Sequence, residues 1–204
     1  MKQSQKTQIY LASGSPRRAE LLTQMGVSFE RLSVNVDEAL KPQEDVCEYV
    51  SRLALEKAIE GGRKALDKTI PVLGADTAIF VNGLKGSNGE TLGKPRDYGD
   101  ACRMMNMLSG STHQVLTAVA LVDEKIQLHI VQTTYVTMRD ISEKEIEAYW
   151  KTGEPLDKAG GYAIQGSAAV FISKIEGSYS GVMGLPIFET ANLLADYRIS
   201  SALK

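Results

Sequence analysis

The sequence holds little that would support a disulfide framework, a membrane span or a nucleic-acid-binding surface. Only two of its 204 residues are cysteines, Cys47 and Cys102, too few for a disulfide framework or a cysteine-based zinc site. No apolar run approaches the length of a membrane-spanning helix, and residues 1–8 are polar, unlike a signal peptide. Lysine and arginine number 23 against 25 for aspartate and glutamate, so the net charge of −2 gives no electrostatic reason to expect duplex nucleic acid. We expect a cytoplasmic protein whose anion sites are local.

Common nucleotide-binding and hydrolase motifs are absent as well. The sequence contains neither GxxxxGK[ST] nor GxGxxG, so it predicts neither a P-loop nor a dinucleotide-binding fold. His113 and His129 lack the spacing of metal ligands, and each is predicted to be an ordinary strand histidine. Ser13 and Ser15 have no histidine in a recognisable hydrolase context, which argues against a serine nucleophile.

The order of periodic segments predicts an α/β protein with a mixed sheet. Hydrophobic residues make up 43% of the chain, enough for a sizeable core in one domain. The patterns predict strands at 9–13, 28–34, 71–81, 115–122, 126–138 and 168–175, and helices at 16–25, 44–66, 97–109, 142–151 and 186–197. A polar, glycine-rich loop is predicted at 82–93, and the strands at 115–122 and 126–138 are predicted to form a hairpin.

The predicted helix at 16–25 begins with two adjacent arginines. Ser15 is a good N-cap residue, and Pro16 favours the first helical position. Acidic residues are expected in the first turn, because the amide end of a helix carries partial positive charge. Arg17 and Arg18 stand there instead, at a cost of roughly 0.3 to 1 kcal/mol for each cation. We therefore expect an anion to bind at this helix start.

Two charged residues occupy positions that are predicted to be buried. Lys57 continues an apolar stripe that includes Val50 and Leu53, so it either snorkels to solvent or meets an anion. Asp76 lies in the apolar run PVLGADTAIFV, where desolvation would raise its pKa toward a value useful for a general base. The alternative for Asp76 is a capping role at a bend between two strands.

Other polar segments are weaker candidates on their own. GKPRD places Lys94 and Arg96 beside a predicted helix start, and DKAGGYAIQG combines Lys158 and Gln165 with small residues. A glutamine amide can both donate to and accept from a nucleobase edge. Glu38, one of two acids after a predicted strand, is a candidate second oxygen ligand for a metal. The alternative for Lys94 and Arg96 is ordinary solvated surface. The alternative for the segment of Lys158 and Gln165 is a flexible loop, and for Glu38 it is a solvated acid.

The motifs together resemble one known family. They are LASGSPRRAELL, LALEKA, GADT, GKPRD, LSGSTHQVLTAVAL, EPLDKAGGYAIQG and GLPIFET, in this order between about residues 9 and 195. This combination resembles the Maf family of nucleoside triphosphate pyrophosphatases. The resemblance implies an ITPase-like single domain over 1–204, with a mixed twisted central sheet, helices on both faces, and a substrate cleft between two lobes.

The reaction implied by the resemblance is hydrolysis between the α and β phosphates, which gives a nucleoside monophosphate and pyrophosphate with the help of Mg²⁺ or Mn²⁺. Asp76 is implied as the general base, with Glu38 and Asp76 as metal contacts and Lys57 as a catalytic phosphate clamp. The further substrate contacts implied are Ser13, Arg17, Arg18, Lys94 and Lys158, although pairing with a surface acid is the alternative for Arg18.

The residues that read the base indicate a subtype. Arg17, Thr77 and Gln165 resemble those of the type that acts on dTTP and UTP. The sister type that acts on 7-methyl-GTP has a bulky residue before the arginine of the first motif and a glutamate before the late glycine, and this chain has neither. The loop at 83–93 is longer than in compact relatives, by the letters KGSNG.

The expected partners are small molecules, nucleoside triphosphates, with no duplex nucleic acid and no membrane. Because members of the family are often dimers, the resemblance also implies a homodimer. Two other classes remain open. Sugar-phosphate nucleotidyltransferases open with LAxGxGxR, although Pro16 replaces their second glycine here, and a division regulator that only senses nucleotides would need no chemistry.

Overall fold

The computed structural model describes residues 6–83, 89–199 and 201, and its strands form one mixed sheet. The strands are β1 (Ile9–Ala12), β2 (Phe29–Arg31), β3 (Val72–Val81), β4 (Glu90–Leu92), β5 (Thr112–Val122), β6 (Gln127–Met138) and β7 (Ile172–Glu176). Their order is β2-β1-β3-β5-β6-β7, and β4 pairs with β3. β1 is parallel to β2 and β3, whereas β4 is antiparallel to β3 and β7 is antiparallel to β6. The predicted α/β class with a mixed sheet is confirmed.

The helices begin close to where the sequence places them. They are α1 (Pro16–Gln24), α2 (Val46–Lys64), α3 (Tyr98–Leu108), α4 (Glu143–Lys151), α5 (Tyr179–Val182) and α6 (Ile187–Asp196), with 3-10 turns η1 (Ala159–Gly161) and η2 (Ser167–Phe171). None of the helices in the described part of the chain combines the length and the apolar composition of a membrane span.

The chain folds as two compact units. The first unit consists of Met1–Asp76, Thr117–Gln132 and Gly184–Lys204, and the second consists of Thr77–Leu116 and Thr133–Met183.

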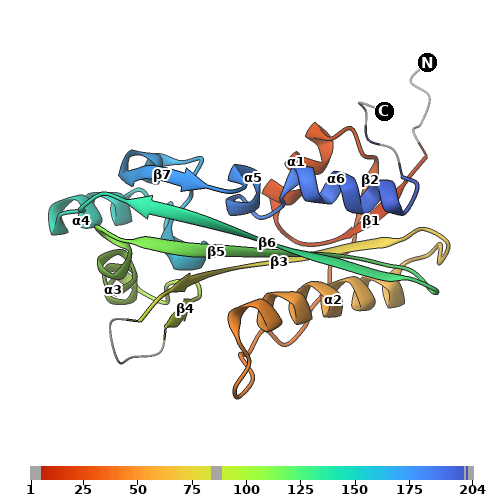
Figure 1. The fold of residues 1–204 in the computed structure, drawn as a ribbon, viewed down its shortest axis with the longest axis horizontal. Coiled ribbons are helices and arrows are strands. Elements are labelled where there is room, and N and C mark those ends of the chain that lie inside the picture. Colours follow the sequence, from red (N-terminus) through yellow and green to blue (C-terminus); the bar gives the residue numbers. More distant parts are fainter. Residues whose placement is uncertain (1–5, 84–88, 200, 202–204) are drawn as a thin grey trace. The chain divides into compact units, whose positions relative to one another are not determined.

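The first unit contains the parallel strands β2, β1 and the start of β3, with helices on both faces. In Figure 1, α2 lies on one side of β1 and the start of β3, and α1 and α6 lie on the other side. The α2 layer approaches β3 closely at Gly74, because a Cβ atom there would lie 2.3 Å from the Ala54 carbonyl oxygen and 2.6 Å from the Ala58 nitrogen. This contact fixes the stretch of β3 that ends in Asp76 against α2.

Replacing Gly74 by Ala is expected to destabilise the protein by about 1–3 kcal/mol, because the added methyl group meets backbone atoms that cannot move aside. Gly62→Ala is the matched control. Gly62 lies in α2, and a Cβ there meets nothing within 4 Å. Replacing a helical glycine by alanine is expected to stabilise the protein by up to about 1 kcal/mol. Urea unfolding measures both changes, and equal stability of the two variants would contradict the close-approach argument.

The second unit has a core of its own, built from apolar side chains of several elements. They include Ile79 and Val81 of β3, Met104, Met105 and Leu108 of α3, Val136 and Met138 of β6, Ile146 and Tyr149 of α4, and Tyr162, Ile164 and Phe171. The capping box predicted for Ser142 and Glu145 is present at the start of α4, where the Glu145 carboxylate accepts a hydrogen bond from the Ser142 amide.

Three parts of the predicted secondary structure are wrong. The predicted loop at 82–93 contains β4, the predicted strand at 168–175 begins as the 3-10 turn η2 before β7, and the short helix α5 was not predicted. Each depends on partners distant in sequence, which local patterns do not report. The predicted extension KGSNG lies mostly outside the described residues.

Candidate functional site

The two predicted acids of the first unit, Glu38 and Asp76, meet at the ammonium group of Lys57. The Lys57 Nζ atom lies 2.7 Å from Asp76 Oδ1 and 2.6 Å from Glu38 Oε1. The Lys57 side chain is 12% exposed and that of Asp76 is 10% exposed, whereas the Glu38 side chain is 54% exposed. Lys57 therefore meets two carboxylates and does not snorkel to solvent, and Glu38 is the member of this carboxylate–lysine cluster that reaches the surface.

The environment of Asp76 makes its carboxylate a stronger base than that of an exposed aspartate. Burial raises the pKa of Asp76, and the positive charges of Lys57 and Arg18 oppose this rise only in part. A carboxylate buried within an apolar strand, with a raised pKa, accepts a proton more readily than usual. This is the chemistry required of a general base.

Arg18, in the first turn of α1, is held by hydrogen bonds to two other segments of the first unit. Its Nε atom donates to the Gly184 carbonyl at 2.8 Å, and its Nη1 atom donates to Ser13 Oγ at 3.1 Å. Burial lowers the pKa of Arg18, while the negative charge of Asp76 raises it. These two hydrogen bonds hold the guanidinium to neutral oxygens of Gly184 and Ser13, close enough to Asp76 for its negative charge to act on Arg18.

The other residues around the start of α1 are arranged less simply than the sequence suggests. Ser15 occupies the N-cap position, but its side chain makes no capping hydrogen bond, and its backbone N–H donates to Ser13 Oγ at 3.2 Å. Arg17 is half-buried, and burial lowers its pKa while Glu20 raises it. No acidic residue lies in the first turn, as the sequence indicates. The amide end of α1 is therefore open to an anion.

The remaining predicted site residues belong to the second unit. The Gly160 N–H donates to the Gly93 carbonyl at 2.9 Å, so the segment that starts at Lys158 lies beside the residue that precedes Lys94. Both Gly160 and Gly161 have a positive φ, and a Cβ on Gly160 would lie 2.7 Å from Ile79 Cδ1. The two glycines thus permit this close packing.

The exposure of these side chains differs. Lys94 and Gln165 are exposed, whereas Lys158 and Thr77 are half-buried. The Lys158 Nζ atom donates to the Leu156 carbonyl at 3.3 Å. The structure brings the segments of Lys94 and Lys158 together, and it presents Gln165 at the end of the second segment.

Sequence reasoning missed Glu154, which holds the backbone next to Gln165. The Glu154 carboxylate accepts hydrogen bonds from the Tyr149 hydroxyl at 2.9 Å, the Ser167 amide at 2.8 Å and the Ala168 amide at 3.2 Å. A Cβ on Gly166 would lie 2.4 Å from both carboxylate oxygens, so a side chain there would displace the Glu154 carboxylate from its present position. The signal in the sequence was the acid in EPLDK, which has no periodic pattern to mark it.

The carboxylate–lysine cluster offers few protein ligands to a metal. Among the described residues, no group of three or more histidine, cysteine, aspartate or glutamate side chains is placed to hold a metal ion. Glu38 and Asp76 nevertheless both reach one point, which the Lys57 ammonium occupies. Two carboxylates fit the usual binding of Mg²⁺, which takes one or two carboxylates and completes its shell with water and substrate phosphate oxygens.

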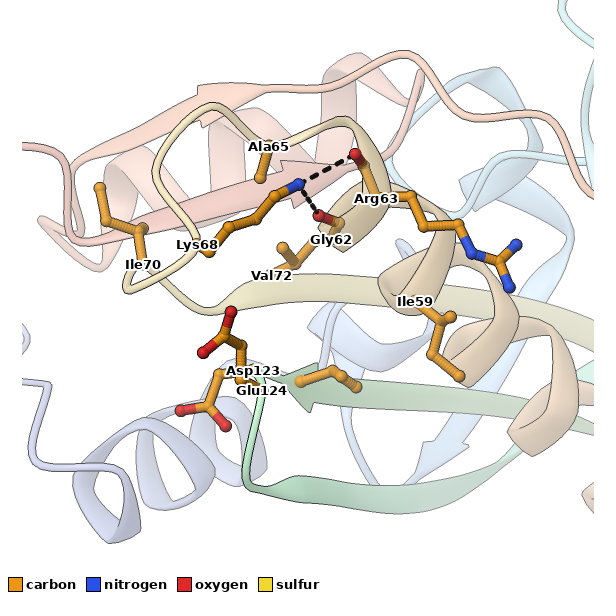
Figure 2. Close-up of a pocket in the computed structure, with 10 residues that line it drawn as sticks. Ile59, Gly62, Arg63, Ala65, Lys68, Ile70, Val72, Asp123 and Glu124 are labelled. Carbon is orange, nitrogen blue, oxygen red and sulfur yellow. Dashed lines mark hydrogen bonds between the residues drawn. The ribbon is translucent and has the colours of Figure 1, made fainter.

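A separate hollow in the first unit contains none of the predicted site residues. Its volume is about 270 Å³, and it is lined by the last turns of α2, the following loop and the turn between β5 and β6 (Figure 2). The Lys68 ammonium donates to the carbonyl groups of Gly62 at 2.7 Å and Arg63 at 2.9 Å, which the dashed lines in Figure 2 mark. Lys68 therefore satisfies the end of α2.

The fold and these contacts define a mixed α/β protein in which a buried lysine and aspartate meet an exposed glutamate, in the same unit as a helix that begins with two arginines. The family described as Maf-like protein matches residues 8–197, and the chain belongs to this family. The resemblance noted in the sequence is therefore confirmed.

Curated relatives match along nearly the whole chain. The chain is 50% identical over 191 residues to a protein of Escherichia coli O157:H7 named dTTP/UTP pyrophosphatase, with 94% of this chain and 93% of the relative covered. Proteins of Shigella dysenteriae serotype 1 and Salmonella typhimurium strain LT2 bear the same name and match with the same identity and coverage. Half of the residues are thus shared with proteins named for one activity.

Proposed function

We propose that this chain is a nucleoside triphosphate pyrophosphatase that hydrolyses dTTP and UTP to the monophosphate and pyrophosphate. The observation that carries the proposal is the buried Asp76 carboxylate, whose pKa burial raises and which contacts Lys57 at 2.7 Å. The names of relatives that are 50% identical over 94% of the chain support both the reaction and the substrates.

In the proposed reaction Asp76 acts as the general base. It takes a proton from a water molecule whose oxygen attacks the α-phosphorus. The bond from that phosphorus to the oxygen bridging the α and β phosphates breaks, and pyrophosphate leaves with the bonding electrons. A buried carboxylate with a raised pKa suits this step because it accepts a proton more readily than an exposed aspartate does.

The cations around the cluster would bind the phosphates and stabilise charge that develops during attack. Arg17, Arg18 and Lys57 would do so from the first unit, where the amide end of α1 adds partial positive charge. Lys94 and Lys158 are proposed as further phosphate contacts from the second unit. Ser13 would support phosphate binding by orienting the Arg18 guanidinium.

Glu38 and Asp76 would hold a divalent metal, Mg²⁺ or Mn²⁺, together with phosphate oxygens of the substrate. Such an ion would neutralise charge on the triphosphate. Of the two carboxylates, Glu38 has the exposed side chain. It is therefore the one suited to release the Lys57 ammonium and bind this ion instead.

Gln165, Thr77 and Arg17 are proposed to select the base. A glutamine amide donates one hydrogen bond and accepts another, which matches the O4 and N3–H pair of thymine and uracil. Cytosine inverts this pattern, so it would leave polar groups unpaired. Gln165 is exposed, and the Glu154 carboxylate holds the backbone that follows it, which supports this assignment.

The compartment and the assembly stay predictions. Cys47 and Cys102 are both free thiols, which fits a reducing cytoplasm. A homodimer remains implied by the family, and size-exclusion chromatography with light scattering would test it.

The experiment that tests the function is pyrophosphate release from dTTP, UTP, CTP, GTP and 7-methyl-GTP, with Mg²⁺ or Mn²⁺. Faster turnover of dTTP and UTP than of the other three, with the monophosphate as the product and no acceptor required, is expected. A requirement for a sugar-phosphate acceptor would support the nucleotidyltransferase alternative. Binding without turnover of any triphosphate would support a nucleotide-sensing regulator.

A further inference from the structure

Helix α2 holds the segment that carries Glu38 by its backbone as well as by its side chain. The Tyr49 hydroxyl donates to the Glu38 carbonyl at 3.0 Å. The Arg52 Nη2 atom donates to the Ala39 carbonyl at 3.0 Å, and its Nη1 atom lies 3.5 Å from the Asp37 carbonyl. Consecutive carbonyl groups on either side of Glu38 are therefore attached to the helix that supplies Lys57.

Arg52 is itself held in one orientation. Its Nε and Nη2 atoms donate to the two carboxylate oxygens of Glu44, at 2.5 and 2.8 Å, in a bidentate pair. Both side chains are largely covered, with 15% of Arg52 and 8% of Glu44 exposed. The bond to Arg52 lowers the pKa of Glu44 to about 2, so this carboxylate stays ionised at any pH at which the protein would work. A planar guanidinium fixed in this way presents its remaining donors in a defined direction.

Glu38 needs such support because its own segment provides little. Residues 32–41 form neither helix nor strand, and the Glu38 side chain is 54% exposed. A long side chain on an irregular segment loses backbone and rotamer entropy when it is held at one point. Fixing the backbone beforehand reduces that loss when the carboxylate binds Lys57 or a metal.

We propose that Tyr49 and Arg52 are positioning residues that set the Glu38 carboxylate against Lys57 and Asp76. The proposal rests on the proposed function, since it gives the site one more determinant of its geometry. Tyr49, Arg52 and Lys57 lie along one helix, so a single rigid element orients both the main chain and the carboxylate of Glu38.

The test is a double-mutant cycle with Glu38. Tyr49→Phe removes one hydroxyl, and Arg52→Lys keeps the charge but loses the fork of donors. Each is made alone and combined with Glu38→Gln, and kcat and KM for dTTP are measured with Mg²⁺. Each single variant is expected to lower kcat by about three- to tenfold, the range of one lost hydrogen bond. In the Glu38→Gln background the further loss is expected to be less than about twofold.

Two results of the cycle would overturn the proposal. Equal losses in both backgrounds would show that Tyr49 and Arg52 act on the fold and not through Glu38. Unchanged kcat in the single variants would show that Glu38 needs no such support. Tyr135→Phe, at an exposed tyrosine of β6, is the matched control and should leave kcat unchanged.

A second measurement separates this proposal from the proposed function. Hydrogen exchange of the amides at 37–41 in the free protein is expected to be several-fold faster in Tyr49→Phe than in the wild type, because one attachment of the segment is lost. Unchanged exchange would overturn the positioning role whatever the activity. Faster exchange together with full activity of Glu38→Gln would support the positioning role of Tyr49. It would also show that the role proposed for Glu38 in catalysis is wrong.

Discussion

Replacing Asp76 by Asn is expected to lower kcat for dTTP by about 10²- to 10⁴-fold, the range that general bases contribute. Asparagine has nearly the same shape and keeps an oxygen toward the Lys57 ammonium, which lies 2.7 Å from Asp76 Oδ1. It cannot take a proton from water. Binding of dTTP is therefore expected to remain, and steady-state kinetics together with calorimetric titration of the variant would measure the two effects separately.

The matched control is Asp37→Asn, which removes the neighbouring acid of the Glu38 segment. Asp37 is exposed, and its carboxylate accepts a hydrogen bond from the Ala39 amide. Asparagine accepts the same bond, so kcat should change little. Equal activity of Asp76→Asn and the wild type would remove Asp76 from the role of base.

The pH dependence of kcat/KM offers an independent check on the same residue. The base must be ionised in the free enzyme, and burial raises the pKa of Asp76. As the pH is lowered, kcat/KM is therefore expected to decrease. This decrease should begin at a higher pH than it would if the base were an aspartate of ordinary pKa. Exchange of Lys57 for Met removes the largest charge that opposes this rise, so the fall should move to still higher pH in that variant.

Features encoded over a few residues were predictable from the sequence. Asp97 and the pair Ser142 and Glu145 mark the starts of α3 and α4, because a cap depends on residues within one helical turn. The lysine and the aspartate in apolar runs could be singled out in the same way, since a buried charge is costly wherever its partner lies. The sequence did not say that Lys57 and Asp76 are each other's partners.

Features that depend on distant contacts were not predictable. Glu154 acts on amides 13 and 14 residues away, and Tyr49 acts on a carbonyl 11 residues before it. No periodicity links such positions, because the link is made by the packing of whole elements. The same reason applies to the start of β7 at Ile172, because the preceding residues form η2, whose first amides donate to the distant Glu154 carboxylate.

Acidification is expected to destabilise the protein through His113, a buried histidine in the second unit. Its side chain is 0% exposed and its Nε2 atom shares a hydrogen bond of 2.8 Å with the Tyr162 hydroxyl, while Nδ1 has no partner among the described residues. Burial lowers the pKa of His113 to about 4, against about 6.5 in an unfolded chain. Between these values the unfolded chain binds a proton that the folded protein does not.

This contribution to stability is fully present above about pH 6.5 and is lost as the pH falls toward about 4, where the accumulated loss amounts to about 3 kcal/mol. His113→Gln keeps an amide for the Tyr162 hydroxyl and removes the titrating ring, so its unfolding free energy should decline less than that of the wild type. His129→Gln, at the exposed histidine of β6, is the control and should decline like the wild type. Urea unfolding at several pH values from 7 to 4.5 measures the difference, which carboxylate titration cannot produce because all three proteins share the same carboxylates. Parallel curves for His113→Gln and the wild type would mean that the ring is protonated in the folded state, and hence that the second unit opens to water at His113.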